Sequence, residues 1–324
     1  MSARIRRGNL DLTLEPGETV LDALLRGGAE ITRSCRAGVC QACMQRAIAG
    51  DPGAAAQQGL SPALQAQGYF LPCVARPTGE LVIADGPPPS IGASVVDVTE
   101  IGARIVRVRL QPDEALAYRP GQFVQVIHGG LVRAYSLASV PETDAPLELH
   151  VRVHPHGQMS RRLAEARAGD RVELRGPSGN CFYTEGRPEQ PILLAGTGTG
   201  LAPLQAIARD ALGRGHTGPI TLIHGALDVG GFYGVEPLIA LAASAPNFRY
   251  VRCALSGEPA EGLEIGDLKA VVARVLPEMK GVRVFLCGDP ELVAALKKQC
   301  FLRGASMRDI SADAFLTAAP PVAA

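Results

Sequence analysis

The sequence predicts a multidomain protein with three consecutive modules: a small α+β β-grasp module, an antiparallel β-barrel and a doubly wound α/β domain. Three observations predict this. Four of the eight cysteines crowd the N-terminal quarter, short β-rich runs fill the middle, and apolar runs alternate with helical stretches towards the end. We place the modules at residues 1–85, 93–186 and 187–317, with a linker at 86–92 and a tail at 318–324.

Length and composition fit this division. The chain has 324 residues, 47% hydrophobic and 20% charged, so it can bury more than one core. Its 32 basic and 32 acidic residues give a formal net charge of zero, so the charge does not indicate binding to nucleic acid or to an anionic membrane surface. We find neither a secretory signal at the start nor an apolar run of about 18 residues. We therefore expect a cytoplasmic protein with no membrane partner, whose clustered thiols bind metal.

The N-terminal module begins with "LDLTLEPGETVLDALLRGG", residues 10–28. This stretch predicts a strand, a Pro-Gly turn and a short helix. The helix is expected to begin near a Thr19 cap and to end at Gly27 or Gly28, directly before the cysteine-rich loop.

The cysteine spacing favours an iron–sulfur cluster. Three cysteines are spaced C-x4-C-x2-C and a fourth follows after 29 residues; they are Cys35, Cys40, Cys43 and Cys73. A zinc site usually has two CxxC pairs or added histidines, but here there is one CxxC and all six histidines lie at position 128 or beyond. A [2Fe–2S] cluster takes four thiolates, three of them from one loop. Zinc stays as the alternative.

Residues 1 to about 85 resemble a plant-type ferredoxin domain, and the four cysteines match its cluster ligands. Gln41 departs from the pattern, since relatives usually have glycine before the third cysteine, and we expect it to crowd the loop. Cys181, Cys253 and Cys300 are interpreted as small buried hydrophobic residues.

The middle of the chain predicts an antiparallel barrel. Its expected strands are residues 94–101, 103–110, 121–128, 147–153 and 170–177. "RAYS", residues 133–136, ends a barrel strand, and "HGQMSRRL", residues 156–163, predicts a helix start whose free amides suit a pyrophosphate. An arginine at a strand end is well shaped to contact the same phosphates.

Together these motifs resemble the ferredoxin–NADP reductase superfamily, whose barrel binds FAD. The resemblance implies that Arg133 pairs with the diphosphate, Tyr135 packs on the isoalloxazine and Ser136 bonds near flavin N5. The flavin-binding residues it implies are Arg133, Ala134, Tyr135, Ser136, His150, Val151, Arg152, Gly157, Gln158, Met159 and Ser160. A metal site at His150, His154 and His156 is a weaker alternative.

The last module alternates apolar strands, expected at residues 191–196, 219–226, 248–255 and 282–289, with helical stretches. "LLAGTGTGLAPL", residues 193–204, is a glycine-rich turn between a strand and a helix. Alone it is weak evidence for nucleotide binding, because tight turns often use glycine. Its place after a flavin-type barrel and before "FLCGDPELV" matches the same superfamily.

The resemblance implies that this module holds the pyridine nucleotide, that Ser136 and Cys287 flank the hydride path, and that Asp313 and Phe315 lie by the flavin. The other implied binding residues are Gly198, Thr199, Gly200, Asp228, Gly288, Asp289 and Phe315. The window 224–237 has no arginine or lysine for a 2′-phosphate, and Asp228 suits a ribose diol, so NADH is favoured over NADPH.

NADH gives two electrons as hydride and an iron–sulfur cluster accepts one, so FAD between them connects the two chemistries. The domain order resembles reductase components of multicomponent oxygenases, which implies a ferredoxin or a terminal oxygenase as electron acceptor. Two alternatives are an iron–sulfur flavin reductase of deoxysugar biosynthesis and a non-catalytic electron-transfer or redox-sensing subunit.

Overall fold

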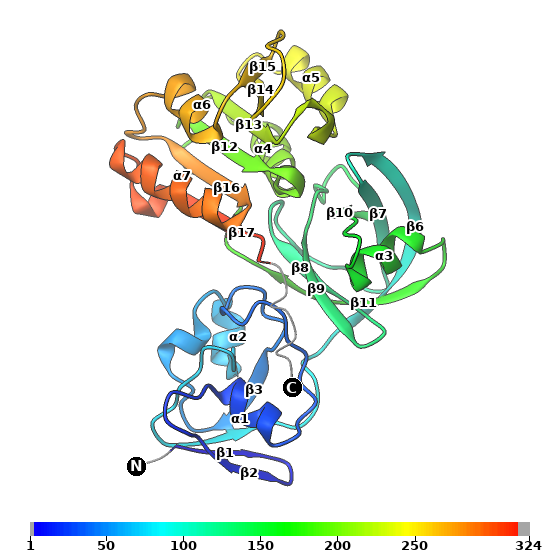
Figure 1. Ribbon diagram of the computed structural model, residues 1–324, viewed down its shortest axis with the longest axis vertical. Helices are drawn as coiled ribbons and strands as arrows, with labels where there is room; N and C mark the ends of the chain where they lie inside the picture. Colours follow the sequence, from blue (N-terminus) through cyan, green and yellow to red (C-terminus); the bar gives the residue numbers. More distant parts are fainter. Residues whose placement is uncertain (1–2, 317–324) are drawn as a thin grey trace.

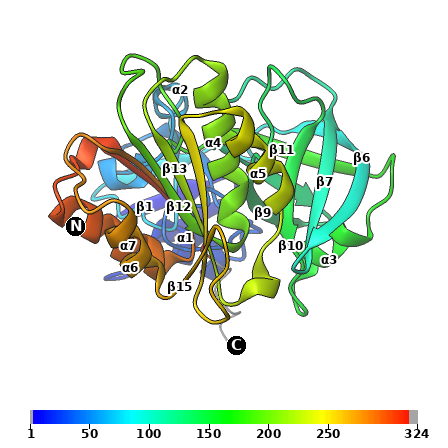
Figure 2. The ribbon, with the colours of Figure 1, turned by 90° about the horizontal axis from the view of Figure 1, so that it is seen from above.

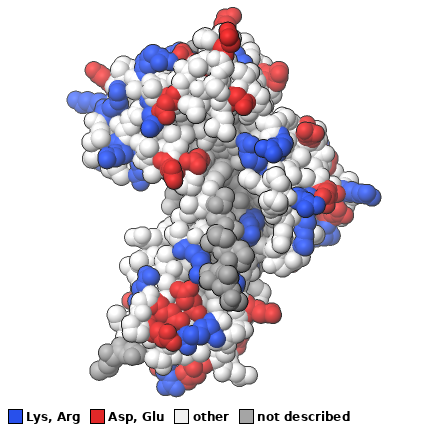
Figure 3. Space-filling model, viewed as in Figure 1, with Lys and Arg blue, Asp and Glu red and all other residues white. Residues whose placement is uncertain are grey.

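The computed structural model describes residues 3–316, which form three domains in chain order. In Figure 1 the N-terminal domain (blue) lies at one end, the barrel (cyan to green) lies in the middle, and the α/β domain (green to red) lies at the other end. Figure 2 shows the helices of the α/β domain on both faces of its sheet. Figure 3 shows acidic and basic side chains interspersed on the visible face. Within the described residues no helix is both long and apolar enough to cross a membrane.

The N-terminal domain is a five-stranded sheet with the order β2-β1-β5-β3-β4, in which β1 pairs parallel to β5 and antiparallel to β2. Its elements are β1 (Arg4–Arg7), β2 (Leu10–Thr13), α1 (Val20–Arg26), β3 (Gln45–Ala49), η1 (Ala54–Gln57), α2 (Pro62–Ala66), β4 (Tyr69–Phe70) and β5 (Glu80–Ile83). Thr19 and Asp22 form a capping box at the start of α1, and Gly27 follows its end, as the sequence predicts. The loop that carries three cysteines runs from α1 to β3.

The barrel is a six-stranded antiparallel sheet with the order β10-β7-β6-β11-β8-β9. Its elements are β6 (Ile91–Gly102), β7 (Ile105–Pro112), β8 (Phe123–His128), β9 (Leu131–Ser136), β10 (Leu147–Arg152), α3 (Gln158–Glu165) and β11 (Arg171–Ser178). A bridge between Leu137 and Leu149 joins the two outer strands and closes the barrel. The strand β6 begins at Ile91, inside the stretch expected as linker, since pairing of Ile91 with Leu174 continues the ladder. Residues 133–136 end β9, which forms a hairpin with β8.

The α/β domain is a parallel sheet with the order β15-β14-β13-β12-β16-β17. Its elements are β12 (Ile192–Thr197), η2 (Gly198–Gly200), α4 (Leu201–Gly213), β13 (Ile220–Ala226), η3 (Val229–Gly231), α5 (Val235–Ser244), β14 (Phe248–Ala254), β15 (Leu263–Ile265), α6 (Leu268–Val275), β16 (Arg283–Gly288), α7 (Pro290–Leu302), η4 (Met307–Asp309) and β17 (Ile310–Ala314). The strand order reverses at β12, which lies between β13 and β16. In open parallel sheets ligands bind at such a switch point, beyond the carboxyl ends of the strands.

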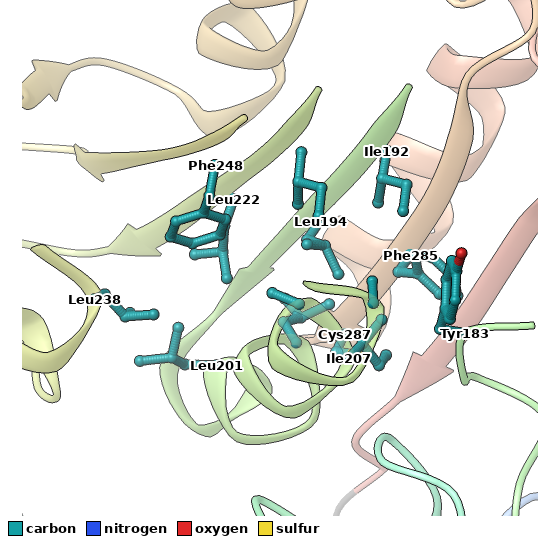
Figure 4. Packing of buried hydrophobic residues seen from close by; sticks show 14 of the residues in the cluster. Tyr183, Ile192, Leu194, Leu201, Ile207, Leu222, Leu238, Phe248, Phe285 and Cys287 are labelled. Carbon is teal, nitrogen blue, oxygen red and sulfur yellow. The ribbon is translucent and has the colours of Figure 1, made fainter. Parts of the chain in front are cut away.

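The core of the α/β domain continues into the barrel. Ile192, Leu194 and Phe285 of the sheet pack with Ile207 of α4, and Tyr183, which follows the barrel, joins the same cluster (Figure 4). All five side chains are buried. The shared core makes the α/β domain and the barrel pack directly on one another.

Gly121 allows this close approach. A Cβ at Gly121 would overlap the Cys181 carbonyl oxygen and would lie 2.7 Å from Cδ1 of Ile207 in α4. Its φ of +98° also favours glycine.

We predict that Gly121→Ala destabilises the protein more than Gly169→Ala does. Gly169 lies in the same barrel with a φ of +91°, and an added methyl group would meet nothing within 4 Å, so it reports the backbone cost alone, ~1–2 kcal/mol. Overpacking at Gly121 adds ~1–3 kcal/mol to the loss in free energy of unfolding. Thermal and denaturant unfolding measure the difference. Equal losses in the two variants would contradict this account of the junction.

Candidate functional site

The four predicted ligands of the cluster lie together around the loop between α1 and β3. They form two close pairs, Cys35 with Cys40 and Cys43 with Cys73. Backbone amides point at the sulfur atoms: the amides of Ala37 and Cys40 each lie 3.4 Å from Sγ of Cys35. Such amide–sulfur contacts are typical of iron–sulfur sites, where they stabilise negative charge on the thiolates.

The same contacts change the acidity of the thiols. Bonding to Cys40 lowers the pKa of Cys35 to about 5, with further help from the nearby backbone amides. In the second pair, bonding to Cys43 lowers the pKa of Cys73. One thiol of each pair is therefore ready to act as a thiolate ligand.

The pairing fits two irons that take two thiolates each. A tetrahedral zinc ion needs all four ligands around one centre, whereas a two-iron cluster takes its ligands in two separated pairs. The donor set thus fits a [2Fe–2S] cluster better than it fits zinc.

Gln41, inside this loop, adopts an unusual backbone conformation. Its φ is +58°, in the left-handed region that glycine occupies at little cost. This conformation explains why related ferredoxin domains usually have glycine at the position of Gln41. The expected crowding is avoided because the Gln41 side chain bonds to the Gly59 carbonyl and the Ser178 hydroxyl.

The predicted phosphate-binding residues of the barrel lie on β9 and at the start of α3, two elements that are in contact. Gly157 precedes α3, and no side chain caps the first amides of this helix, which leaves them available to an anion. Ser160 bonds to the backbone of His154 and Gly157 and so fixes the turn. Arg133 is partly buried in β9 and donates to the Val132 carbonyl. The donors present fit a diphosphate.

Other predicted flavin-binding residues contribute differently. The side chains of Val151 and Met159 are buried in the barrel core, so only their backbone can face a ligand. Ala134 is exposed, and Gln158 begins α3. Burial raises the pKa of the Tyr135 hydroxyl, so this side chain of β9 stays neutral.

Three residues from three strands converge where the barrel meets the α/β domain. Ser136, at the end of β9, donates a hydrogen bond from Oγ to Oδ2 of Asp313 over 3.3 Å. Asp313 lies on β17 directly opposite Cys287 of β16 in the parallel ladder. The structure thus brings together Ser136, Cys287 and Asp313, which are far apart in the sequence.

Asp313 has an altered acidity at this junction. Burial raises its pKa to about 6 from the ordinary value of 3.8, although the Ser136 hydrogen bond acts in the opposite direction. Burial also raises the pKa of Cys287 well above its usual range, so this thiol stays protonated. The raised pKa allows the Asp313 carboxyl to change charge near pH 6.

The glycine-rich turn after β12 lies at the switch point of the sheet. A Cβ at Gly200 would overlap the Cys287 carbonyl oxygen, so only glycine lets the turn pack against the end of β16. A Cβ at Gly198 would lie 2.9 Å from Nη2 of Arg152, which places this barrel guanidinium beside the turn. Uncapped amides at the start of α4 complete a cradle that suits a dinucleotide diphosphate.

The remaining predicted residues of this domain lie after the carboxyl ends of β13, β16 and β17 and within η2. Asp289 caps α7 through its side chain, and its amide lies 3.4 Å from Oγ1 of Thr197. The Phe315 amide donates to the Gly288 carbonyl at 2.8 Å. Asp228 is exposed beyond the end of β13, and Thr199 lies within η2.

His150 links two domains. Its Nε2 lies 2.8 Å from Oε1 of Glu148, and its Nδ1 lies 3.1 Å from the hydroxyl of Tyr233 in the α/β domain. His154 and His156 are exposed. Sequence patterns carry no signal for Tyr233, nor for Gln125, whose buried side chain reaches the Cys40 carbonyl across the other domain boundary. Both contacts join segments too distant in the chain for local patterns to reveal.

Comparison with known families agrees with this geometry. Residues 5–78 match the 2Fe-2S iron-sulfur cluster binding domain, residues 93–183 match the oxidoreductase FAD-binding domain, and residues 194–298 match the oxidoreductase NAD-binding domain.

Whole-chain relatives share all three parts. The reductase subunit of an aromatic O-demethylase from an Amycolatopsis species is 35% identical over 98% of this chain and 100% of its own length. The chain belongs to the family of ferredoxin-fused reductases of multicomponent oxygenases. The ferredoxin–NAD(P)+ reductase component of the naphthalene 1,2-dioxygenase/salicylate 5-hydroxylase systems of a Ralstonia species is 33% identical over 95% of this chain and 96% of its own length. The crystal structure of the Amycolatopsis cytochrome P450 reductase aligns with a TM-score of 0.69, at 33% identity, over 97% of this chain and 99% of its own.

The family assignment makes this chain an oxidoreductase with domains for a [2Fe–2S] cluster, FAD and a pyridine nucleotide. Electrons enter such a reductase from the nucleotide and pass by way of FAD to the cluster.

We predict that Asp313 controls a pH dependence of flavin reduction. Above pH 6 the charged carboxylate orients the Ser136 hydroxyl, and below pH 6 protonation weakens that contact. The rate of ferricyanide reduction with NADH should therefore fall below an inflection near pH 6, and Asp313→Asn should remove the inflection.

The free energy of unfolding should change with pH in the opposite direction to the rate. Because the folded pKa of Asp313 is raised, the wild-type protein should lose free energy of unfolding as pH rises from about 4 to about 6, and Asp313→Asn should lose less. An unchanged pH profile of both rate and stability in Asp313→Asn would contradict the assigned pKa.

Proposed function

We propose that this reductase uses NADH and releases single electrons from its N-terminal domain to a ferredoxin or a terminal oxygenase. When bound, FAD supplies the ability to take up a hydride and to give up its electrons one at a time. The residues of the chain bind, orient and shield the reacting groups. Because the cysteines, all of them within the described residues, form no disulfide and thiols stay reduced in the cytoplasm, we place the protein there.

The observation that carries this proposal is that one hairpin contacts both other domains. Strands β8 and β9 pair from Phe123–Ser136 to His128–Leu131. At one position the hairpin contacts the α/β domain through Ser136 and Asp313, and at another it contacts the cysteine loop through Gln125 and Cys40. A flavin held by this hairpin would have the nucleotide-binding domain on one side and the cysteine loop on the other.

The proposed roles follow from position. Gly198, Gly200 and the first turn of α4 would hold the nucleotide diphosphate, and Cys287 would lie beside the nicotinamide. Ser136 would hydrogen-bond to the flavin, with Asp313 orienting the Ser136 hydroxyl. Arg133 and the amides that follow Gly157 would hold the diphosphate of FAD. Phe315 follows β17 and donates its amide to the Gly288 carbonyl, and its side chain would shield the flavin from water.

The preference for NADH rests on the end of β13. Asp228 is exposed there, and residues 224–237 contain no arginine or lysine. A 2′-phosphate placed beside Asp228 would meet a like charge without a cation to pair with, whereas a ribose diol can donate hydrogen bonds to the carboxylate.

We predict that Asp228→Arg shifts the preference towards NADPH. Removing the carboxylate and adding a guanidinium supplies a charge-assisted hydrogen bond, so the NADPH/NADH ratio of kcat/KM should rise at least ~10-fold. Glu278→Arg is the matched control, because Glu278 is an exposed acidic residue of the same domain outside residues 224–237 and undergoes the same change of charge. A similar ratio in both variants would show that Asp228 does not contact the ribose.

The exit through the cluster is tested with Cys73→Ser. The wild-type protein should contain about two irons per chain, and NADH should bleach its flavin bands under anaerobic conditions. Cys73→Ser removes one thiolate of the Cys43–Cys73 pair, so cytochrome c reduction should fall to a few per cent while ferricyanide reduction by the flavin continues. Both rates and the iron content are measured on the same preparation.

Cys253→Ser is the control for this test. The Cys253 thiol is buried in the α/β domain and donates to the Gly266 carbonyl, a contact that a hydroxyl can replace. Full-rate cytochrome c reduction by Cys73→Ser would place the exit elsewhere. A reductase that serves a dehydratase would still reduce cytochrome c, but it would fail to reduce the ferredoxin component of a dioxygenase in a single turnover.

A further inference from the structure

The strained left-handed backbone of Gln41 is stabilised in part by a hydrogen bond from another domain. Gln41 has a φ of +58° and is only 3% exposed. A buried non-glycine residue keeps such a conformation when surrounding contacts hold it there. Its Nε2 donates to the Gly59 carbonyl at 3.0 Å, and its Oε1 accepts from the Ser178 hydroxyl at 2.8 Å. Ser178 ends β11, so the second bond crosses from the cysteine loop to the barrel.

The adjacent residue, Cys40, makes a second bond across the same boundary. Nε2 of Gln125 donates to the Cys40 carbonyl at 3.0 Å. Gln125 is 1% exposed, and its neighbours Val124 and Val126 pack into the barrel core. Because side chains alternate along a strand, Gln125 faces out of the barrel towards the N-terminal domain.

Arg175 fixes the orientation of the Gln125 amide. Nη1 of Arg175 donates to Oε1 of Gln125 at 3.3 Å, which leaves the NH2 group of that amide to face Cys40. Two consecutive hydrogen bonds thus connect the Arg175 guanidinium, through the Gln125 amide, to the backbone of Cys40, a predicted cluster ligand. In the β8–β9 ladder Gln125 lies opposite Ala134, within the strand that is expected to bind the flavin.

Apolar packing between the two domains is interrupted at this place. A cleft of roughly 360 Å³ opens beside the contacts, lined by Met44 and Tyr69 of the N-terminal domain and by Leu174 and Arg175 of the barrel. Since the cleft removes part of the contact area, specific hydrogen bonds contribute more to the relative orientation of the domains.

We propose that Gln41 and Gln125 are positioning residues that hold the cysteine loop against the flavin-binding hairpin. We name the four residues Cys40, Gln41, Gln125 and Ser178 the interdomain bridge. The bridge fixes the distance between flavin and cluster. The rate of internal electron transfer is therefore not limited by reorientation of the N-terminal domain. This inference rests on the proposed route of electrons through the cluster.

The first test measures the bridge itself, without turnover. Hydrogen exchange of the oxidised holoprotein is followed in peptides that cover residues 36–44 and 122–126. Ser178→Ala and Gln125→Ala should each accelerate exchange in the loop about fivefold, as expected for the loss of one neutral hydrogen bond. Gln65→Ala is the matched control, because its amide donates only to Leu60 and Gln57 of its own domain.

Gln41→Gly separates backbone strain from bridging. Glycine relieves the strain at φ +58° but removes both side-chain bonds, so loop exchange should accelerate even though the cluster, checked by its visible and EPR spectra, is retained. Slower exchange in this variant would show that strain relief dominates and would overturn the bridging role.

The second test follows electrons in time. After anaerobic mixing with NADH, flavin reduction should keep its wild-type rate in Ser178→Ala, whereas the later reduction of the cluster should slow at least threefold. Unchanged exchange and unchanged cluster reduction in Ser178→Ala, which alters no residue of the N-terminal domain, would overturn the proposal. If electrons instead left from the flavin, the exchange result would stand and only the kinetic result would fail, so the two ideas are distinguished.

Discussion

The β8–β9 hairpin of the barrel contacts both of the other domains, and the proposed electron route depends on these two contacts. This hairpin contributes Ser136 to the junction with the α/β domain and Gln125 to the junction with the cysteine loop. Electron transfer between bound groups requires short, fixed separations, and a single pair of hydrogen-bonded strands sets both separations at once.

The two junctions differ in their physical character. The barrel and the α/β domain share an apolar core that includes Tyr183, Ile207 and Phe285, so they are held by continuous packing. The N-terminal domain meets the barrel beside a cleft and through side-chain hydrogen bonds. The first junction therefore depends on apolar packing, whereas the second depends on directed hydrogen bonds, so single substitutions in the interdomain bridge should loosen the second junction without disturbing the first.

Much of the fold was predictable from the sequence because the relevant signals are local. The spacing of Cys35, Cys40 and Cys43 predicted the loop, and the apolar runs predicted β12, β13, β14 and β16. The three-residue strand β15 carries too little pattern to be found. Gln41 was recognised as unusual from the sequence, but its partner Ser178 lies 137 positions away, and Gln125 lies 85 positions from Cys40. Only the folded chain brings such residues together.

The most direct test of the account is a rapid-mixing experiment with the holoprotein and NADH under anaerobic conditions, repeated over a range of protein concentrations. The account predicts that the flavin bands bleach first and that the EPR signal of the reduced cluster then rises with a rate that does not depend on protein concentration. A rate of cluster reduction that increases in proportion to protein concentration would mean that electrons pass between molecules, and it would contradict the internal route from hairpin to cluster.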